Sequence, residues 1–329
     1  MLRILGYALA VGCLVWVLHD FHVVKFLREM SNVDWKWVLL GMGFDVASYG
    51  VQALRWKMLL KPFGEVRLTR SIRAVYTGLF ANLVFPLRPG EFLRSYLLSN
   101  SENITLGRVL GSLGVERLID LVIATASLAI ASLFVDLPRR FTRVADILGI
   151  VTLVVLAIIV SLILYLEIKL GSNEPPEIEG RGFRAKAMRA LAVLHAIGTA
   201  PSFYPALLLS VLMTFCQILG LWAMVKSYGL PLPFLAVAVV LLVINLGVSL
   251  PNAPANLGSY QFFCVLGLSV FQVEKSTATG FSFFAFLALT FPFVFLGFAA
   301  LMRSGLSMRS MREQVVGLPA GVRKSVPQT

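Results

Sequence analysis

Charged side chains are scarce in this sequence. Asp, Glu, Lys and Arg make up 14% of its 329 residues, whereas a soluble domain carries about 25%. Hydrophobic residues make up 58%, more than one globular core can hold, so most of them must face lipid. Because lipid offers no hydrogen-bond partners, a chain that crosses it must form helices or a closed barrel. The apolar runs are long and do not alternate with polar residues, which predicts an all-α, polytopic transmembrane helix bundle.

Cysteine and histidine are also rare, with three of each. The cysteines are isolated inside apolar runs and lack the spacing of metal ligands, so they are expected to be small buried hydrophobes. The sequence also has no Cys–His pair, activated-serine motif or nucleotide-binding motif. These features predict no metal and no cofactor, and the chain is not expected to be an enzyme. The rare residues are Cys13, Cys216, Cys264, His19, His22 and His195.

The net charge is +12, and its Lys and Arg residues cluster at the ends of apolar runs. In a soluble protein such a charge would favour nucleic acid, but no soluble basic domain remains here to bind one. Cytoplasmic loops of membrane proteins carry this excess, which also attracts anionic lipids. The basic zones are Arg55–Arg73, the polar loop Lys169–Arg189 and the tail after Leu301. They predict a multi-pass protein of the cytoplasmic (inner) membrane with both termini in the cytoplasm.

Several apolar runs have the length, or most of it, that is needed to cross about 30 Å of hydrocarbon. They are Ile4–Leu18, Trp35–Leu60, Leu106–Val135, Ile147–Leu166, Tyr204–Val225 and Ala278–Leu301. Asp20–Asp34 mixes polar and apolar residues and predicts an amphipathic helix at the membrane surface. Trp35, Trp37 and Trp56 are expected in the aromatic belts of the membrane interface.

Two other apolar segments are short and are broken by Pro and Gly. Ser71–Phe85 is followed by a break and continues to about Leu98, and Phe234–Leu250 is followed by a break and Ser259–Phe271. The break residues are Pro86, Pro89 and Gly90 in the first segment and Pro251, Pro254 and Gly258 in the second. In the predicted topology they enter the membrane from opposite faces, which is typical of two re-entrant hairpins in an inverted repeat. The alternative is that the prolines only kink two tilted spans.

The breaks are candidate binding sites. Backbone groups freed by a break survive at membrane depth only in protein or beside a wet cavity, and a helix that begins there offers N–H groups to an anion. Arg88 and Arg94 flank such a helix start, and a guanidinium suits phosphate. Asn82 and Asn256 are further candidate ligands for a lipid headgroup or phosphate, and Asn245 is a weaker one.

Carboxylates and arginines gather near the first break. Charges inside a membrane are costly unless they pair or meet water, so these residues are expected to form one network. Its predicted members besides the two arginines are Glu91, Glu116, Arg117, Asp120 and Asp45. The alternative is that the network only holds the helices together.

The order and spacing of these residues resemble the lysylphosphatidylglycerol synthase transmembrane (flippase) family. The resemblance is carried by Arg55-Trp56, Asn82-Leu83, Pro86–Glu91, Arg94, Glu116-Arg117-Leu118, Asp120 and Leu257-Gly258. At the second break the chain departs from the family, because Ala255-Asn256 precede Leu257-Gly258 and Gln261 stands where the family carries an acid. Fuller members of the family also carry a soluble synthase domain, and the stretch after Leu301 is too short for one. The synthase activity is therefore not expected here, and the resemblance implies the lipid-translocating activity alone.

The resemblance implies that the protein flips or scrambles a polar-headed lipid, such as an aminoacylated phospholipid, a glycolipid or an isoprenoid lipid. The alternatives are an accessory membrane subunit of a lipid-modifying enzyme or glycosyltransferase, and a lipid-modifying enzyme. Expected partners are the membrane lipid substrate, anionic lipids at the basic loops, and as further candidates a lipid-synthesis enzyme or glycosyltransferase and a second copy of the chain. Residues 1–303 are predicted to form the membrane domain, and residues 304–329 a basic, largely disordered cytoplasmic tail.

Overall fold

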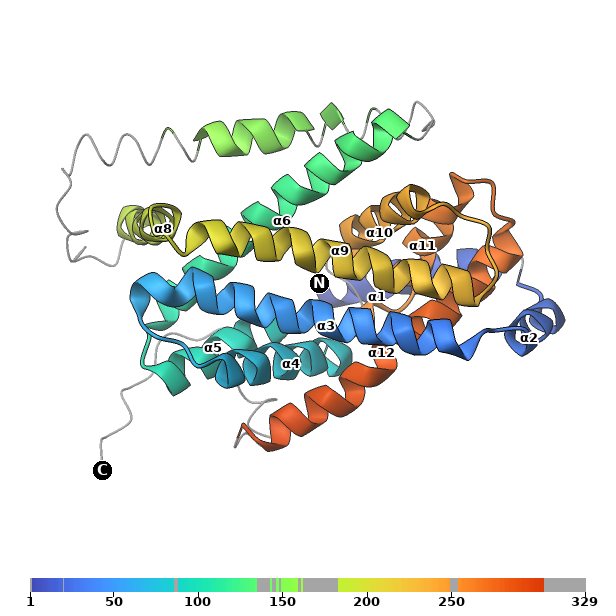
Figure 1. Ribbon diagram of the computed structural model, residues 1–329, viewed down its shortest axis with the longest axis horizontal. Helices are drawn as coiled ribbons and strands as arrows, with labels where there is room; N and C mark the ends of the chain where they lie inside the picture. The colour runs from blue at the N-terminus through green and yellow to red at the C-terminus, as the bar shows by residue number, and fades with distance from the viewer. Residues whose placement is uncertain are drawn as a thin grey trace.

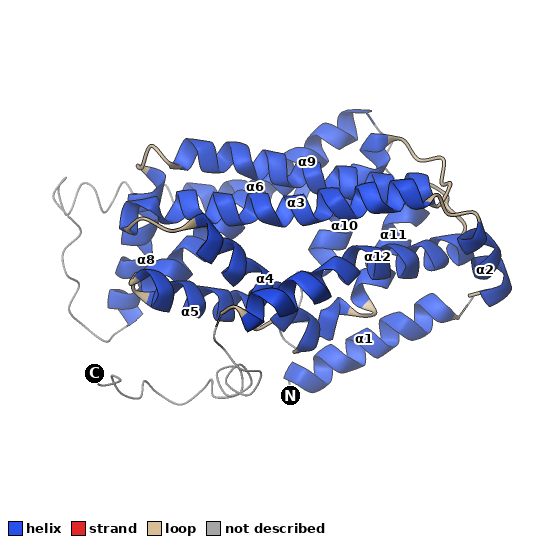
Figure 2. Ribbon diagram, turned by 60° about the horizontal axis from the view of Figure 1, so that its bottom comes forward, coloured by secondary structure: helices blue, strands red, loops and turns tan. Residues whose placement is uncertain are grey.

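The computed structural model describes residues 2–19, 21–85, 88–134, 143, 146–147, 149–158, 161, 183–248 and 254–304. Every regular element in these parts of the chain is a helix, as Figure 2 shows. The labelled α-helices are α1 (Leu2–Leu18), α2 (Val23–Ser31), α3 (Trp35–Leu60), α4 (Leu68–Val84), α5 (Gly90–Glu102), α6 (Leu106–Phe134), α8 (Phe183–Gly198), α9 (Phe203–Ser227), α10 (Phe234–Val248), α11 (Ser259–Ser269) and α12 (Lys275–Met302), with 3₁₀ turns η1 (Lys61–Phe63) and η2 (Pro254–Asn256). A further apolar helix spans Gly149–Ile158, within the predicted run Ile147–Leu166. The prediction of an all-α chain is confirmed for the residues that the structure describes.

Helices α3 and α9 form the most extensive helix pair and lie side by side along most of their lengths (Figure 1). Small residues let their backbones approach closely. A Cβ added to Gly41 would lie 2.9 Å from the carbonyl oxygen of Gly220, so Gly41 has no room for a side chain. Close packing through small residues is typical of helix association in membranes.

The two broken segments form two packed helix pairs, α4 with α5 and α10 with α11. Helix α12 packs against both α4 and α11, and η2 of the second pair contacts α4. The two breaks are therefore brought together from parts of the sequence about 165 residues apart. Pro292 lies inside α12 without ending it, so a proline alone does not account for a break in this chain.

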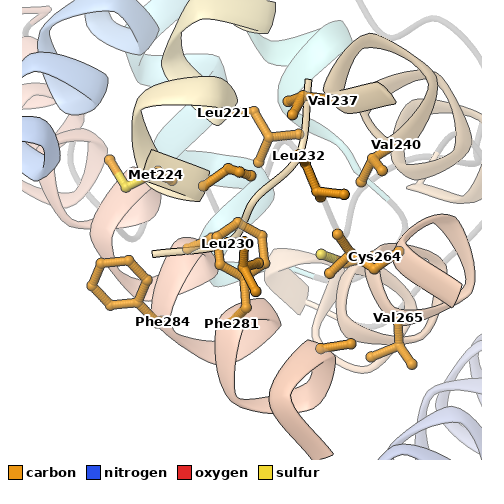
Figure 3. Packing of buried hydrophobic residues seen from close by; sticks show 14 of the residues in the cluster. Leu221, Met224, Leu230, Leu232, Val237, Val240, Cys264, Val265, Phe281 and Phe284 are labelled. Carbon is orange, nitrogen blue, oxygen red and sulfur yellow. The ribbon is translucent and has the colours of Figure 1, made fainter. Parts of the chain in front are cut away.

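A cluster of buried apolar residues joins α9, α10, α11 and α12 (Figure 3). Leu230 and Leu232, in the connection from α9 to α10, insert among side chains of α9, α11 and α12. Cys264 belongs to this cluster and is fully buried, as expected for a small apolar side chain. Cys13 and Cys216 are only partly buried.

Helix α2 is bent by 82° from the second half of α1. The Tyr228 hydroxyl and the Thr277 hydroxyl both donate to the Glu29 carboxylate, over 2.7 and 2.9 Å. The opposite face of α2 exposes Val23, Val24 and Leu27. The predicted amphipathic helix is confirmed: one face of α2 contacts the bundle through Glu29, and the other exposes apolar side chains. Its position at the membrane surface remains a prediction.

By length and composition, α9 and α12 can each cross a membrane, and the bent pair α1–α2 is a further candidate span. Helix α3 has 26 residues and is about 39 Å long at 1.5 Å per residue, but it carries charges within its length. The prediction of a loop over Lys169–Arg189 is wrong from Phe183 onward, because α8 begins there. This stretch is rich in Ala, Arg and Lys, which are strong helix formers. The rest of that loop, Pro86, Pro251 and the tail beyond Ser304 lie outside the described residues.

Candidate functional site

A cavity of about 470 Å³ lies where the two breaks meet. The first break contributes Asn82 and Arg88 to its wall, and the second contributes Asn245 and Asn256. Helices α3, α6, α9 and α12 complete the wall. The candidate ligands predicted at two breaks that are distant in the sequence thus line a single polar cavity inside an apolar bundle.

The first break is shaped by backbone geometry and one side-chain cap. Phe85 is extended, Arg88 adopts a left-handed conformation with φ 54°, and α5 begins at Gly90. The Gly90 N–H donates to the Oδ1 atom of Asn82 over 2.8 Å. Asn82 was predicted as a headgroup ligand, and its carbonyl oxygen is already used to cap the returning helix.

The α4–α5 pair approaches most closely at two glycines. A Cβ on Gly90 would lie 1.9 Å from the carbonyl oxygen of Gly78, and a Cβ on Gly78 would lie 2.7 Å from the carbonyl oxygen of Gly90. Both contacts are with backbone, which cannot move aside as a flexible side chain can. The break therefore depends on glycine at both positions.

We expect Gly90→Ala to destabilise the protein by about 2 kcal/mol or more, because the added methyl group forces α4 and α5 apart. The check is thermal unfolding of the purified variant, with Gly107→Ala as control, since nothing lies within 4 Å of a Cβ there. Equal unfolding temperatures for both variants would contradict this account of the close approach.

Glu116 is the centre of a buried ion-pair network. It is fully buried and lies 2.8 Å from Arg55 Nη2 and 3.2 Å from Arg94 Nη2. The Gln52 side-chain amide also donates to it over 2.7 Å. A buried carboxylate is tolerated only when it is paired and hydrogen-bonded in this way.

The network continues toward the cavity through Asp120, Arg117 and Glu91. Asp120 lies 2.6 Å from Arg55 Nη1 and 3.5 Å from Arg117 Nη1. Arg117 also pairs with Glu91 at the start of α5. Three arginines and three carboxylates are thereby matched, and they join α3, α5 and α6. The predicted grouping of Glu91, Arg94, Glu116, Arg117 and Asp120 is found.

Two expectations about α3 are wrong. Arg55 was assigned to the basic zone of a cytoplasmic loop and Trp56 to the interfacial belt, yet both lie within α3 and are 0% exposed. The Trp56 ring lies 4.8 Å from the Arg94 guanidinium, and its Nε1–H donates to Ser112. Arg55 also donates to the Ser210 hydroxyl of α9. The signal that could have revealed them is helical spacing, because Gln52, Arg55 and Trp56 share a face of α3.

Arg88 and Asp45 line the cavity outside this matched set. The Nη1 group of Arg88 donates to the Val248 carbonyl over 2.6 Å, which ties the first break to the end of α10. Its Nε atom is buried without a hydrogen-bond partner among the described residues. Asp45 was predicted to belong to the network, but its carboxylate has no ion pair or hydrogen bond with a residue that the structure describes.

The second break is polar and uncharged in its described part. Ala255 and Asn256 are left-handed, with φ 57° and 58°. The Gln261 side chain accepts a hydrogen bond from the Gly258 N–H over 2.7 Å and so caps α11. The Oδ1 atom of Asn256 is buried without a partner among the described residues. This oxygen is therefore available to a donor in the cavity.

The fold and the cavity define a multi-pass helical membrane protein in which two broken helix pairs enclose a charged site. The chain belongs to the family of the lysylphosphatidylglycerol synthase TM region, whose model matches residues 3–297. It is also similar to a UPF0104 membrane protein from Methanocaldococcus jannaschii, with 24% identity over 270 residues that cover 77% of this chain and 80% of the relative. The resemblance inferred from the motif residues is confirmed.

Proposed function

We propose that this protein moves a polar-headed lipid between the two leaflets of the membrane. The observation that carries the proposal is the 470 Å³ cavity, which lies inside an apolar bundle and is lined by both breaks and by charged side chains. A headgroup is costly to move through hydrocarbon because its polar groups lose their partners there. A cavity of this kind supplies partners while the acyl chains stay in lipid.

The arginine at the first break supports a phosphate-bearing headgroup. Arg88 faces the cavity, and it is the lining arginine that no carboxylate pairs with among the described residues. Its Nε–H has no partner and its Nη1 is held by a neutral carbonyl. A guanidinium with free donors suits bidentate contact with phosphate. Asn256, which also lines the cavity, offers a neutral acceptor.

The arrangement of the helix pairs supports two re-entrant hairpins in an inverted repeat. Each pair turns back at the cavity, and α12 lies between them. The α2 end of the bundle and the α8 end are opposite in Figure 1. We propose that the α8 end, which carries Lys61, Arg67 and Arg70, faces the cytoplasm, in line with the positive-inside rule.

The test is lipid transfer in liposomes that contain the purified chain. Phosphatidylglycerol with a fluorescent acyl chain is placed in both leaflets, and a membrane-impermeant reductant bleaches the outer one. We expect the protected signal to decay at least about tenfold faster than in protein-free liposomes, which corresponds to a barrier lowered by ~1.4 kcal/mol. An unrelated helical membrane protein is the control. Equal decay for every anionic, zwitterionic and aminoacylated lipid would refute the proposal.

A further inference from the structure

Asp45 occupies an unusual position on α3. It is the eleventh of the 26 residues of this helix, and it shares a face with Tyr49 and Gln52, four and seven residues further on. All three line the cavity. At 1.5 Å per residue, Asp45 lies about 10 Å along the helix from Gln52, where the Glu116 network begins. Its backbone lies against Gly220 of α9, where an added Cβ would come within 3.5 Å of the Asp45 nitrogen.

Every other carboxylate of the site has a cationic partner. Glu91 pairs with Arg117, Asp120 with two arginines, and Glu116 with two arginines. The titratable side chains around Asp45 are phenols instead: Tyr49 on its own helix, Tyr76 on α4 and Tyr260 on α11. From α9 and α12, the polar residues that line the cavity are Thr214, Gln217 and Thr290. None of these groups is a cation that could balance an ionised carboxylate.

The charges of the site balance only if Asp45 and Arg88 are considered together. The matched network is neutral, and the remaining pair is one carboxylate and one guanidinium that line the same cavity without forming an ion pair. When a lipid phosphate binds Arg88, the guanidinium is neutralised and Asp45 is left with an unmatched negative charge. A net charge at membrane depth is costly, and uptake of one proton by Asp45 removes it.

We propose that Asp45 is a proton-binding site which couples the movement of an anionic phospholipid to the movement of one proton. The carboxylate takes up H⁺ on the side where the lipid enters and releases it on the side where the lipid leaves, so lipid and proton cross together without net charge. The proposal rests on the lipid-moving function proposed above. Intramembrane carboxylates that lack a cation partner and line a path are suited to this use.

The test uses the full-length chain in liposomes with acyl-labelled phosphatidylglycerol, equal potassium on both sides and valinomycin to hold the membrane potential near zero. A pH difference of one unit is then imposed. With one proton per lipid, the labelled lipid accumulates in the leaflet facing the alkaline solution by about tenfold. Asp45→Asn, which is neutral at every pH, abolishes this accumulation, and Asp45→Glu retains it. Glu65→Gln, which removes an exposed carboxylate outside the cavity, also retains it.

The outcomes separate the two proposals. If the wild-type chain moves neither labelled phosphatidylglycerol nor any of the zwitterionic and aminoacylated lipids of the liposome test above, the proposed function itself fails. If it moves lipid but the leaflet ratio stays near one, or if Asp45→Asn still accumulates lipid, the proton site at Asp45 is wrong and the lipid-moving function stands. Should Asp45→Asn not fold, a pH dye trapped with the wild-type chain decides the matter: one proton taken up per lipid supports the site, and none overturns it.

Discussion

Replacing Arg88 with alanine is expected to slow lipid transfer by roughly 30- to 150-fold. A hydrogen bond to a charged group contributes about 2–3 kcal/mol when its partner is a desolvated ion, and this energy converts to that range of rate. Arg88 is the cavity-lining arginine whose guanidinium is not matched by a carboxylate of the described network. Its loss therefore removes a free positive charge from the site and leaves the other ion pairs in place.

Arg88 also has a structural contact, and the experiment must separate the two roles. Its hydrogen bond to Val248 joins the two breaks, so Arg88→Ala could act by loosening the cavity. Arg88→Lys keeps the charge and loses the planar fork, and we expect an intermediate rate from it. Arg108→Ala is the matched control, because Arg108 is exposed at the start of α6. A folded Arg88→Ala protein that transfers lipid at the wild-type rate would show that Arg88 does not bind phosphate.

The positions of the two helix breaks could be predicted from the sequence. A hydrophobic run shorter than a membrane span and followed by Pro and Gly predicted an end of α4 near Phe85, and α4 ends at Val84; the predicted end of the second run at Leu250 lies outside the described residues. Proline alone does not predict a break, because Pro292 lies inside α12 without ending the helix. What distinguishes the first break is its pair of glycines and the Asn82 cap, which together let α5 return close to α4.

The partners of each charge were harder to predict. Spacing along one helix shows which residues share a face, but it does not show which other helix lies opposite. Arg55 was therefore assigned to a basic loop, although α6 places Glu116 and Asp120 against it. Asp45 was assigned to the Glu116 network, although it lies nearly three turns from Arg55 along α3, at about 3.6 residues per turn. For this reason Arg55 was missed as a member of the network, and Asp45 was wrongly included in it.

Replacing Glu116 with alanine is expected to have the largest effect on stability. Glu116 is fully buried and faces two arginines that are themselves at most 4% exposed. Removing one partner of such a buried group leaves uncompensated charge and costs about 3–5 kcal/mol, a large part of a typical folding free energy of about 5–15 kcal/mol. The expected result is a fall of the unfolding temperature on the order of 10 °C, measured on the purified protein in detergent.

A partly exposed carboxylate of the same network provides the contrast. The Glu91 and Arg117 side chains are 35% and 51% exposed, so Glu91→Ala is expected to cost only about 0–1 kcal/mol. If burial of unmatched charge is the cause, the double variant Glu116→Ala/Arg94→Ala is less destabilised than the sum of its two single variants, because one buried cation is removed with the anion that held it. Strict additivity, or equal losses for Glu116→Ala and Glu91→Ala, would mean that the network does not stabilise the fold through charge pairing. If instead the double variant is less destabilised than the sum, Glu116 stabilises the fold by joining α3, α5 and α6 through its ion pairs. Substrate binding is then left to the cavity-lining residues outside the matched network, Arg88 and Asp45.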